Sequence, residues 1–265
     1  MTNTRSGGKE SAIQPGPPLI VVIDLWKSFA GRPVLRGVSL EVTRGESLVI
    51  VGGSGAGKTV LLKHIIGLMA PDRGHVIVDG EDITRADSAR CLEIRRRFGM
   101  SFQEGALFDS MSVFENIAFP LRRNTNMAEA EVAARVRECL ALVHLEGVEN
   151  KATNELSGGM RRRVGFARAI ALQPEILLFD EPTTGLDPIT AAVVDSVIVE
   201  MRETLGVTMV TITHDMKSAF RVADRIAMLR AGEIVAEASP EVFRSLPDPY
   251  IRKFLAGEPL EEDVA

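Results

Sequence analysis

The amino-acid sequence predicts an α/β fold in which helices cover a mainly parallel sheet. In the final third of the chain, short β-rich runs alternate with segments of helical spacing. A solid apolar run at residues 47–51 leads directly into a glycine-rich loop and then into a helical pattern. Strand signals thin out between residues 113 and 155, where an Ala- and Glu-rich stretch indicates a helical insertion.

The N-terminal part predicts a leader followed by several short strands. Residues 1–18 are rich in Gly, Ser and Pro and lack an apolar signal-peptide core, so we expect a disordered leader. The run at 38–42 alternates apolar and polar residues like a half-buried strand, whereas the run at 47–51 suits a strand buried on both faces. Strands are predicted at 19–23, 38–42, 47–51, 74–80 and 98–102, and a helix at 59–69.

The second half is predicted to be helical first and alternating afterwards. Apolar residues at helical spacing predict an amphipathic helix over 127–145. The following elements are a helix from 159, a strand at 176–179, a helix from 190, a strand at 207–213, a helix from 216 and a strand at 225–229. The sequence shows no internal repeat, so we expect a single domain over residues 19–245. Within it we expect a helical subdomain at about 104–160, and after it a C-terminal extension at 246–265.

Composition argues against several classes of protein. The net charge of −5 argues against a general nucleic-acid binder, so no nucleic-acid partner is expected. Cys91 and Cys139 lie far apart, which disfavours a disulfide or zinc framework and fits a reducing cytosol. No apolar run approaches the roughly 18 residues that cross a membrane, so we expect any action at a membrane to go through a partner.

A phosphate-binding loop follows the buried strand at 47–51. It matches the pattern G-x-x-x-x-G-K-[ST] at every fixed position and comprises, with the next residue, Gly52, Gly53, Ser54, Gly55, Ala56, Gly57, Lys58, Thr59 and Val60. Glycines let backbone N–H groups turn toward a phosphate at a helix N-terminus. Lys58 is predicted to reach the β- and γ-phosphates, and the Thr59 hydroxyl to ligate Mg²⁺. The loop and its flanking elements therefore predict a P-loop NTPase that binds a nucleotide with Mg²⁺.

Two carboxylates close the apolar run at 176–179. Consecutive residues at a strand end point in different directions, so Asp180 and Glu181 can take different roles. Asp180 is predicted to hold the Mg²⁺ shell, directly or through water. Glu181 is predicted to polarise the attacking water, either as a general base or as a water-positioning group.

Two further segments resemble motifs of the ABC (ATP-binding cassette) ATPases. The first resembles the family's signature, although Met160 replaces the usual Gln; its residues are Leu156, Ser157, Gly158, Gly159 and Met160. The second resembles the D-loop of the dimer seam and contains Gly185, Leu186 and Asp187. We interpret the arginines after the signature as a solvated helix face: Arg161, Arg162, Arg163 and Arg168.

The ABC resemblance covers roughly residues 19–237 and implies both an architecture and an assembly. The architecture is a RecA-like core with an antiparallel β subdomain and an α-helical subdomain. The assembly is a dimer of two copies that bury ATP between the phosphate loop of one and the signature of the other. The domain expected at 19–245 is accordingly an ABC ATPase domain.

The resemblance also implies roles for single residues. Gln103 matches the family's glutamine loop and is expected to touch Mg²⁺ and the attacking water. His214 matches the histidine that contacts the γ-phosphate. Phe29 is expected to stack on adenine, where the family usually has Tyr, with Trp26 as a nearby competitor that could instead belong to the core.

Other features resemble the ATPases of bacterial Mla/Mce-type lipid transport systems. These are Met160, the segment 104–121, the D-loop continuation 187–190, and the tail segments 247–250 and 254–255. This resemblance implies a peripheral subunit on the cytoplasmic face of the inner membrane, under an integral membrane permease and beside an Mce-domain lipid-binding protein. Such a subunit drives phospholipids or other hydrophobic molecules between inner and outer membranes. The segment 104–119 is expected to be a loop region that receives the permease.

Three alternative functions remain. A nutrient importer ATPase, for example for amino acids, has the same catalytic parts. A soluble ABC protein that remodels a ribosome or DNA usually joins two cassettes or carries long coiled-coil insertions, and the sequence shows neither. A non-catalytic scaffold is disfavoured because the catalytic set is complete, comprising Lys58, Asp180, Glu181 and His214.

Overall fold

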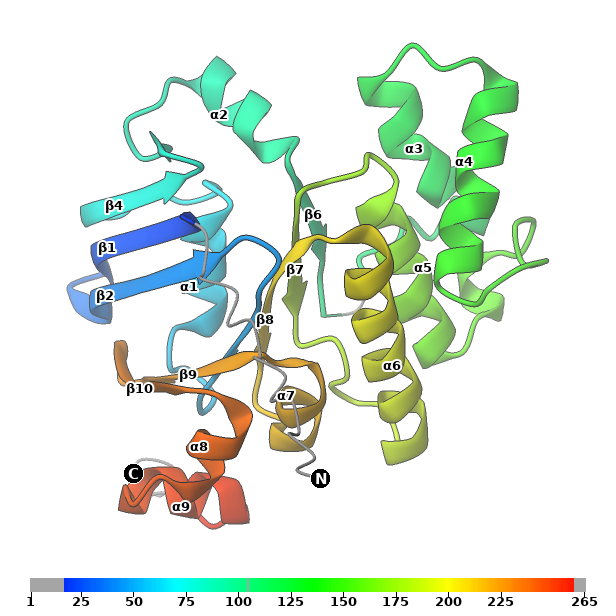
Figure 1. Ribbon diagram of the computed structural model, residues 1–265. Helices are drawn as coiled ribbons and strands as arrows, with labels where there is room; N and C mark the ends of the chain where they lie inside the picture. The colour runs from blue at the N-terminus through cyan, green and yellow to red at the C-terminus, as the bar shows by residue number, and fades with distance from the viewer. Residues whose placement is uncertain (1–16, 104, 260–265) are drawn as a thin grey trace, which may run out of the picture.

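The structure is a computed structural model that describes residues 17–103 and 105–259 (Figure 1). Residues 1–16 of the predicted leader lie outside this range, and Pro18 already belongs to the first strand. The described chain forms two sheets with helices around them. No helix among the described residues is long and apolar enough to cross a membrane.

The first sheet is antiparallel and has the order β2-β1-β4-β5. Its strands are β1 (Pro18–Phe29), β2 (Arg32–Thr43), β4 (Arg73–Val78) and β5 (Glu81–Asp82). β1 and β2 are much longer than predicted. An irregularity near Asp24, which has a positive φ of 46°, follows the β-rich run 19–23 that the prediction used, and β1 continues beyond it.

The second sheet has the order β10-β9-β3-β8-β7-β6 and is parallel except for its edge strand β10. Its strands are β3 (Ser47–Val51), β6 (Phe98–Ser101), β7 (Ile176–Asp180), β8 (Thr208–Thr213), β9 (Arg225–Arg230) and β10 (Glu233–Ala238). Every residue of β3, β7 and β8 is buried, which explains their solid apolar runs. The sequence prediction missed β10.

The register of the parallel strands places their carboxyl ends together. Val51 at the end of β3 lies opposite Thr213 of β8, and Asp180 at the end of β7 lies opposite Ile212. The three loops that follow these strands therefore leave one edge of the sheet side by side, which is where open α/β sheets bind ligands.

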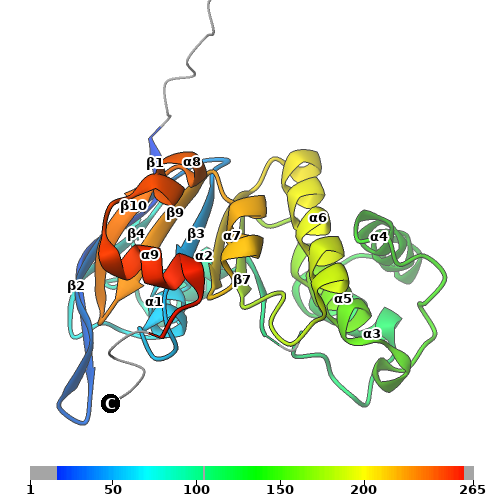
Figure 2. The ribbon, with the colours of Figure 1, turned by 90° about the horizontal axis from the view of Figure 1, so that it is seen from below.

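Helices cover this sheet on both faces (Figure 1). The described residues form the helices α1 (Lys58–Ile65), α2 (Ser88–Arg95), α3 (Val113–Asn124), α4 (Glu129–Leu142), α5 (Gly158–Ile170), α6 (Pro188–Leu205), α7 (Met216–Val222), α8 (Pro240–Ser245) and α9 (Pro249–Ala256), with a 3-10 turn at Thr153–Glu155. α3, α4 and α5 pack together on the side away from the antiparallel sheet (Figures 1 and 2).

The helices correct the prediction at several places. α3 occupies residues expected to be a loop, although a capping box formed by Ser112 and Glu115 indicates the start of a helix there. α1 ends at Ile65, short of the predicted 69, because Gly67 takes a left-handed conformation with a φ of 69°. The sequence prediction also missed α2, α8 and α9.

Two apolar clusters hold the layers together. Leu48 and Ile50 of β3 belong to the cluster that fills the space toward the antiparallel sheet and α1. Val49 and Val51 belong to the cluster on the other face, which includes residues of the helices α3 to α7. Ile251 of α9 is buried in this second cluster, so the described part of the predicted C-terminal extension, residues 246–259, packs onto the domain through α9.

Candidate nucleotide site

The loop between β3 and α1 has the backbone that the phosphate-loop pattern requires. Gly55 and Gly57 have positive φ values of 75° and 104°. A Cβ atom on Gly57 would lie 2.9 Å from Leu35 Cδ2 and 3.0 Å from the Val34 oxygen, so a larger residue would push β2 away. A Cβ atom on Gly52 would lie 2.2 Å from the Leu229 oxygen. The loop is therefore held tightly between β2 and β9.

Lys58 lies buried at the start of α1, above this loop. Its Nζ donates hydrogen bonds to the oxygens of Gly52 at 2.8 Å and Gly53 at 3.0 Å, and lies 3.6 Å from Glu181 Oε1. Burial lowers the pKa of the ammonium, while the negative charge of Glu181 opposes that fall. A cation held over a turn of glycine N–H groups is suited to a phosphate.

Thr59 and Asp180 form a pair of oxygen donors beside Lys58. The Thr59 hydroxyl donates to Asp180 Oδ1 at 3.4 Å. Burial raises the pKa of the Asp180 carboxyl, and the adjacent Glu181 carboxylate adds to that rise. Hydroxyl and carboxylate oxygens fit Mg²⁺, which binds through a few protein oxygens together with phosphates. The described residues contain no cluster of three or more His, Cys, Asp or Glu side chains able to hold a metal.

Glu181 is the most constrained acidic side chain of the site. Its backbone has a positive φ of 50°. Its Oε2 accepts hydrogen bonds from the Thr184 hydroxyl at 2.9 Å and from the His214 backbone N–H at 3.3 Å. His214 Nδ1 lies 2.9 Å from the same oxygen. The carboxylate is therefore held at one position between β7 and β8.

Lys58, Thr59, Glu181 and His214 line one cavity of about 750 Å³, a size typical of small-ligand sites. Its lining comprises residues 53–60 together with Val34, Gln103, Glu181, Thr184, His214, Phe254, Gly257, Glu258 and Pro259. The predicted residues 53–60, Gln103, Glu181 and His214 thus meet here, whereas Gly52 and Asp180 are not part of the lining. The C-terminal residues were missed, although the Asp248 cap and the Pro249 start of α9 were visible in the sequence.

The predicted adenine-stacking residue does not line this cavity. Phe29 lies at the end of β1, 43% exposed, with Lys27 Nζ 5.7 Å from its ring centre. Its competitor Trp26 is 37% exposed and donates its indole N–H to Asp24 Oδ1, so Trp26 is not a core residue. Stacking of Phe29 on adenine stays a prediction.

The signature-like segment also lies outside the cavity of its own chain. Ser157 caps α5 and accepts a hydrogen bond from the Met160 N–H at 3.3 Å, as its residue type predicts. A Cβ atom on Gly159 would lie 2.4 Å from Thr190 Cγ2, and one on Gly158 would lie 3.1 Å from Leu186 Cδ2. The glycines therefore allow the signature to pack against the D-loop segment.

The D-loop is rigid at its end. Asp187 caps α6, where its Oδ1 accepts hydrogen bonds from the N–H groups of Ile189 and Thr190, both at 3.0 Å. Its Oδ2 accepts a further one from the Thr190 hydroxyl at 2.5 Å. Thr190 is consequently held by hydrogen bonds to Asp187 and also lies against Gly159 of the signature-like segment.

The prediction of a solvated arginine face on α5 holds only for Arg161, which is exposed, and is wrong for Arg162, Arg163 and Arg168, which are buried or partly buried. Arg162 is buried and donates to the Thr184 oxygen at 2.8 Å, which connects α5 to the loop after Glu181. The other three also donate to backbone oxygens: Arg161 to Leu156, Arg163 to Val143 and His144, and Arg168 to Gly105 and Ala106. Arginine suits such carbonyl-rich sites because its donors form a planar fork.

The contact between Gly159 and Thr190 predicts a rescue experiment. Gly159→Ala is expected to lower the free energy of unfolding by about 1–3 kcal/mol, because the added methyl overpacks against Thr190 Cγ2. Thr190→Ser removes that methyl and keeps the hydroxyl bonded to Asp187, so the double variant should regain most of the loss. Urea unfolding of the three variants checks this. An equal loss in the single and double variants would contradict the steric explanation.

Comparisons with known proteins agree with this geometry. A family model described as "ABC transporter" matches residues 35–184. The chain is 43% identical over 238 residues to the "Probable ribonucleotide transport ATP-binding protein mkl" of Mycobacterium tuberculosis, covering 90% of this chain and 66% of that protein. It is 41% identical over 239 residues to the "Intermembrane phospholipid transport system ATP-binding protein MlaF" of Escherichia coli, covering 90% and 89%.

Solved structures give the same result. One is the "Dimeric structure of a post-hydrolysis state of the ATP-binding cassette MJ0796 bound to ADP and Pi", with a TM-score of 0.76, 32% identity, and coverage of 83% of this chain and 98% of that one. A second is the cbiO1 protein of Clostridium perfringens, described as part of an ABC transporter complex, with a TM-score of 0.79, 28% identity, and coverage of 91% and 98%. The chain thus matches almost all of each solved cassette but spans only 66% of the Mycobacterium tuberculosis relative.

Proposed function

This chain belongs to the ABC transporter family, and from that premise we propose that it is the ATP-hydrolysing subunit of a bacterial ABC transporter for phospholipids or other hydrophobic molecules. The observation that carries the ATPase assignment is the meeting of Lys58, Glu181 and His214 around one cavity at the end of the parallel sheet. The lipid assignment draws on the similarity to the intermembrane phospholipid transport protein over nearly the full length of both chains.

The proposed mechanism assigns one task to each side chain. Lys58 binds the β- and γ-phosphates, and Glu181 polarises the attacking water as a general base or water-positioning group. His214 holds Glu181 through its ring nitrogen and is close enough to the cavity to contact the γ-phosphate. Mg²⁺, when bound by Thr59, Asp180 and Gln103, neutralises charge on the phosphate oxygens.

The proposed active unit is a dimer with composite sites. The signature segment does not line the cavity of its own chain, which supports a site that the signature of a second copy completes. Similar cassettes have been solved as dimers, which supports this assembly. ATP between the two copies would hold them together, and hydrolysis would release them.

The other proposed partners lie at the membrane. We place the subunit on the cytoplasmic face of the inner membrane, under a permease and in one system with an Mce-domain lipid-binding protein. An exposed ring pair supports a docking site on α3: Phe108 and Phe119 have ring centres 5.1 Å apart and are 42% and 41% exposed. A hollow of about 230 Å³ begins beside Phe119 and is lined by Met111, Glu115, Arg122 and Arg123.

A charge at Phe108 is expected to uncouple this subunit from the permease. Phe108→Asp should weaken permease binding by at least about 30-fold, as loss of a buried aromatic anchor does. ATP hydrolysis by the isolated subunit should stay within about twofold, because Phe108 does not line the nucleotide cavity. Leu92→Asp on α2, 54% exposed, is the matched control. Leu107 is unsuitable because it packs on the core, so a charge there would test folding.

The decisive experiment for the transported molecule uses the copurified permease complex in liposomes. Phospholipids are expected to stimulate its ATPase activity, while amino acids and ribonucleotides are not. Stimulation by amino acids with their binding protein, and none by lipid, would assign the chain to a nutrient importer. Stimulation by ribonucleotides alone would instead favour the activity named for the mycobacterial relative.

A further inference from the structure

A buried carboxylate joins the helix that begins at the D-loop to the helix that begins after His214. Asp195 lies in the middle of α6 and is 1% exposed. Its Oδ1 accepts a hydrogen bond from the Ser218 hydroxyl at 2.5 Å, and its Oδ2 accepts one from Arg221 Nη1 at 3.0 Å. Both donors belong to α7. These three residues do not line the described nucleotide cavity, and the mechanism above does not use them.

Burying a carboxylate at this position costs free energy, so the contacts that it makes need a functional explanation. Burying the charge of Asp195 costs free energy that its ion pair only partly offsets, and an apolar residue of similar size would often be at least as stable. What Asp195 provides, and an apolar residue cannot, is two directed contacts that fix the orientation of α7. Since α7 has seven residues, it is too short to hold its place without such tertiary contacts.

The contacts of Ser218 transmit this restraint to the nucleotide site. Its backbone N–H donates to Asp215 Oδ1 at 3.4 Å, so Asp215 and Asp195 hold the first turn of α7 from two sides. His214 directly precedes Asp215 and reaches Glu181 Oε2 with both its backbone N–H and its Nδ1. A shift of this turn would move His214 relative to Glu181.

The N-terminal end of α6 carries the contacts to the signature. α6 starts at the Asp187 cap, and Thr190 in its first turn touches the position where Gly159 lacks a side chain. We propose that Asp195 is a positioning residue that holds α7, and through it His214, in a fixed relation to the D-loop and signature of the same chain. The inference rests on the proposed ATPase function and adds a residue to it.

Three variants test the proposal by steady-state kinetics of the full chain. Ser218→Ala removes one hydrogen bond, and Asp195→Ala removes both contacts. Each is expected to lower kcat for ATP hydrolysis by about 10-fold or more with KM within about twofold, because small misplacements of a catalytic group act on turnover. Asp195→Asn keeps an oxygen for Ser218 and should retain more activity than Asp195→Ala.

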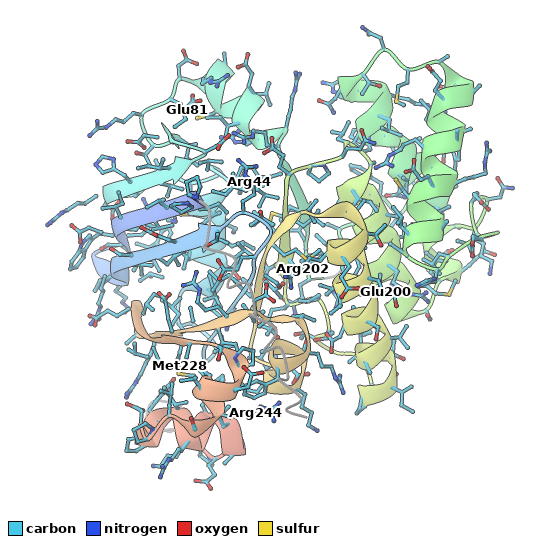
Figure 3. The ribbon with its side chains drawn as sticks, in the orientation of Figure 1. Arg44, Glu81, Glu200, Arg202, Met228 and Arg244 are labelled. Carbon is cyan, nitrogen blue, oxygen red and sulfur yellow. The ribbon has the colours of Figure 1, made fainter. Side chains whose placement is uncertain are left out.

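The matched control changes a carboxylate elsewhere on the same helix. Glu200 lies on α6 and faces away from α7, and its Oε2 lies 2.6 Å from His144 Nε2 (Figure 3). Glu200→Gln should leave kcat and KM unchanged. Thermal melting of every variant identifies any that is unfolded at the assay temperature. If a variant is unfolded, the result for Ser218→Ala, the smallest change, decides whether the proposal holds.

A second measurement does not depend on turnover. The imidazole proton resonances of the nucleotide-free chain can be assigned to His214 by their loss in His214→Ala. Ser218→Ala is expected to shift the His214 resonance and leave those of His64, His75 and His144 in place. A His214 resonance that does not move in Ser218→Ala overturns the proposal. A kcat of that variant within twofold of the kcat of an active wild type also overturns it. If the wild type hydrolyses no ATP, the proposed function fails, and the resonance alone decides this inference.

Discussion

Glu181→Gln is expected to lower kcat for ATP hydrolysis by about 10²–10³-fold, as loss of a general base does, while ATP affinity stays within a few-fold. The amide oxygen can still accept the hydrogen bonds of Thr184 and of the His214 backbone, so the shape of the site is kept. The substitution removes the charge that polarises water and that faces Lys58 Nζ and His214 Nδ1. Turnover and equilibrium nucleotide binding should be measured on the same preparation.

The control for Glu181→Gln is Glu258→Gln, which changes an exposed carboxylate in the lining of the same cavity. That variant should hydrolyse ATP at the wild-type rate. Because the Glu181 variant binds ATP without splitting it, it should also accumulate as the ATP-bound dimer in gel filtration. Hydrolysis near the wild-type rate by Glu181→Gln would remove Glu181 from the mechanism.

Mixing two inactive chains should restore activity if the sites are composite. Lys58→Ala disables the phosphate loop, and Ser157→Arg places a bulky cation on the signature. Each homodimer is expected to lose at least about 10²-fold in turnover, since neither retains an intact site. An equimolar mixture should regain about one quarter of wild-type activity, because half of the dimers are mixed and each has one intact site.

The composite-site prediction has a clear contrary result. If one chain alone catalysed hydrolysis, the mixture would stay inactive whenever Ser157→Arg was inactive, and wild-type activity per chain would not change on dilution. A dimer instead predicts activity per chain that falls as the protein is diluted. Arg123→Ala, an exposed substitution in the proposed permease-docking hollow, serves as a neutral partner in control mixtures.

The sequence predicted best those features in which neighbouring residues determine local structure. The phosphate loop was recognisable because its strand, glycines and helix are contiguous. Asp180 and Glu181 followed from a strand buried at every position. The buried strands β3, β7 and β8 were found for the same reason, since a run of apolar residues reports burial on both faces.

The failures come from contacts between distant parts of the chain. The charges of the α5 arginines suggest a solvated surface, yet Arg162 reaches a carbonyl 22 positions away. β1 continues beyond the irregularity near Asp24 that follows the run 19–23. The C-terminal residues of the cavity lie about 200 positions after the phosphate loop. Local sequence patterns do not show which distant segments come into contact, because those contacts depend on the order of strands in the sheet.

That strand order also governs when the chain can fold as it is synthesised. β3 ends at residue 51, but its two sheet neighbours, β8 and β9, begin only at residues 208 and 225. A nascent chain that has not reached residue 208 therefore carries a strand that is apolar apart from Ser47 and has two open edges, an arrangement prone to pairing with other chains. The predicted phosphate loop leaves the ribosome early, but its contact with Leu229 of β9 can form only much later. Protection by chaperones during that interval matters more for this chain than for one whose strands pair in sequence order.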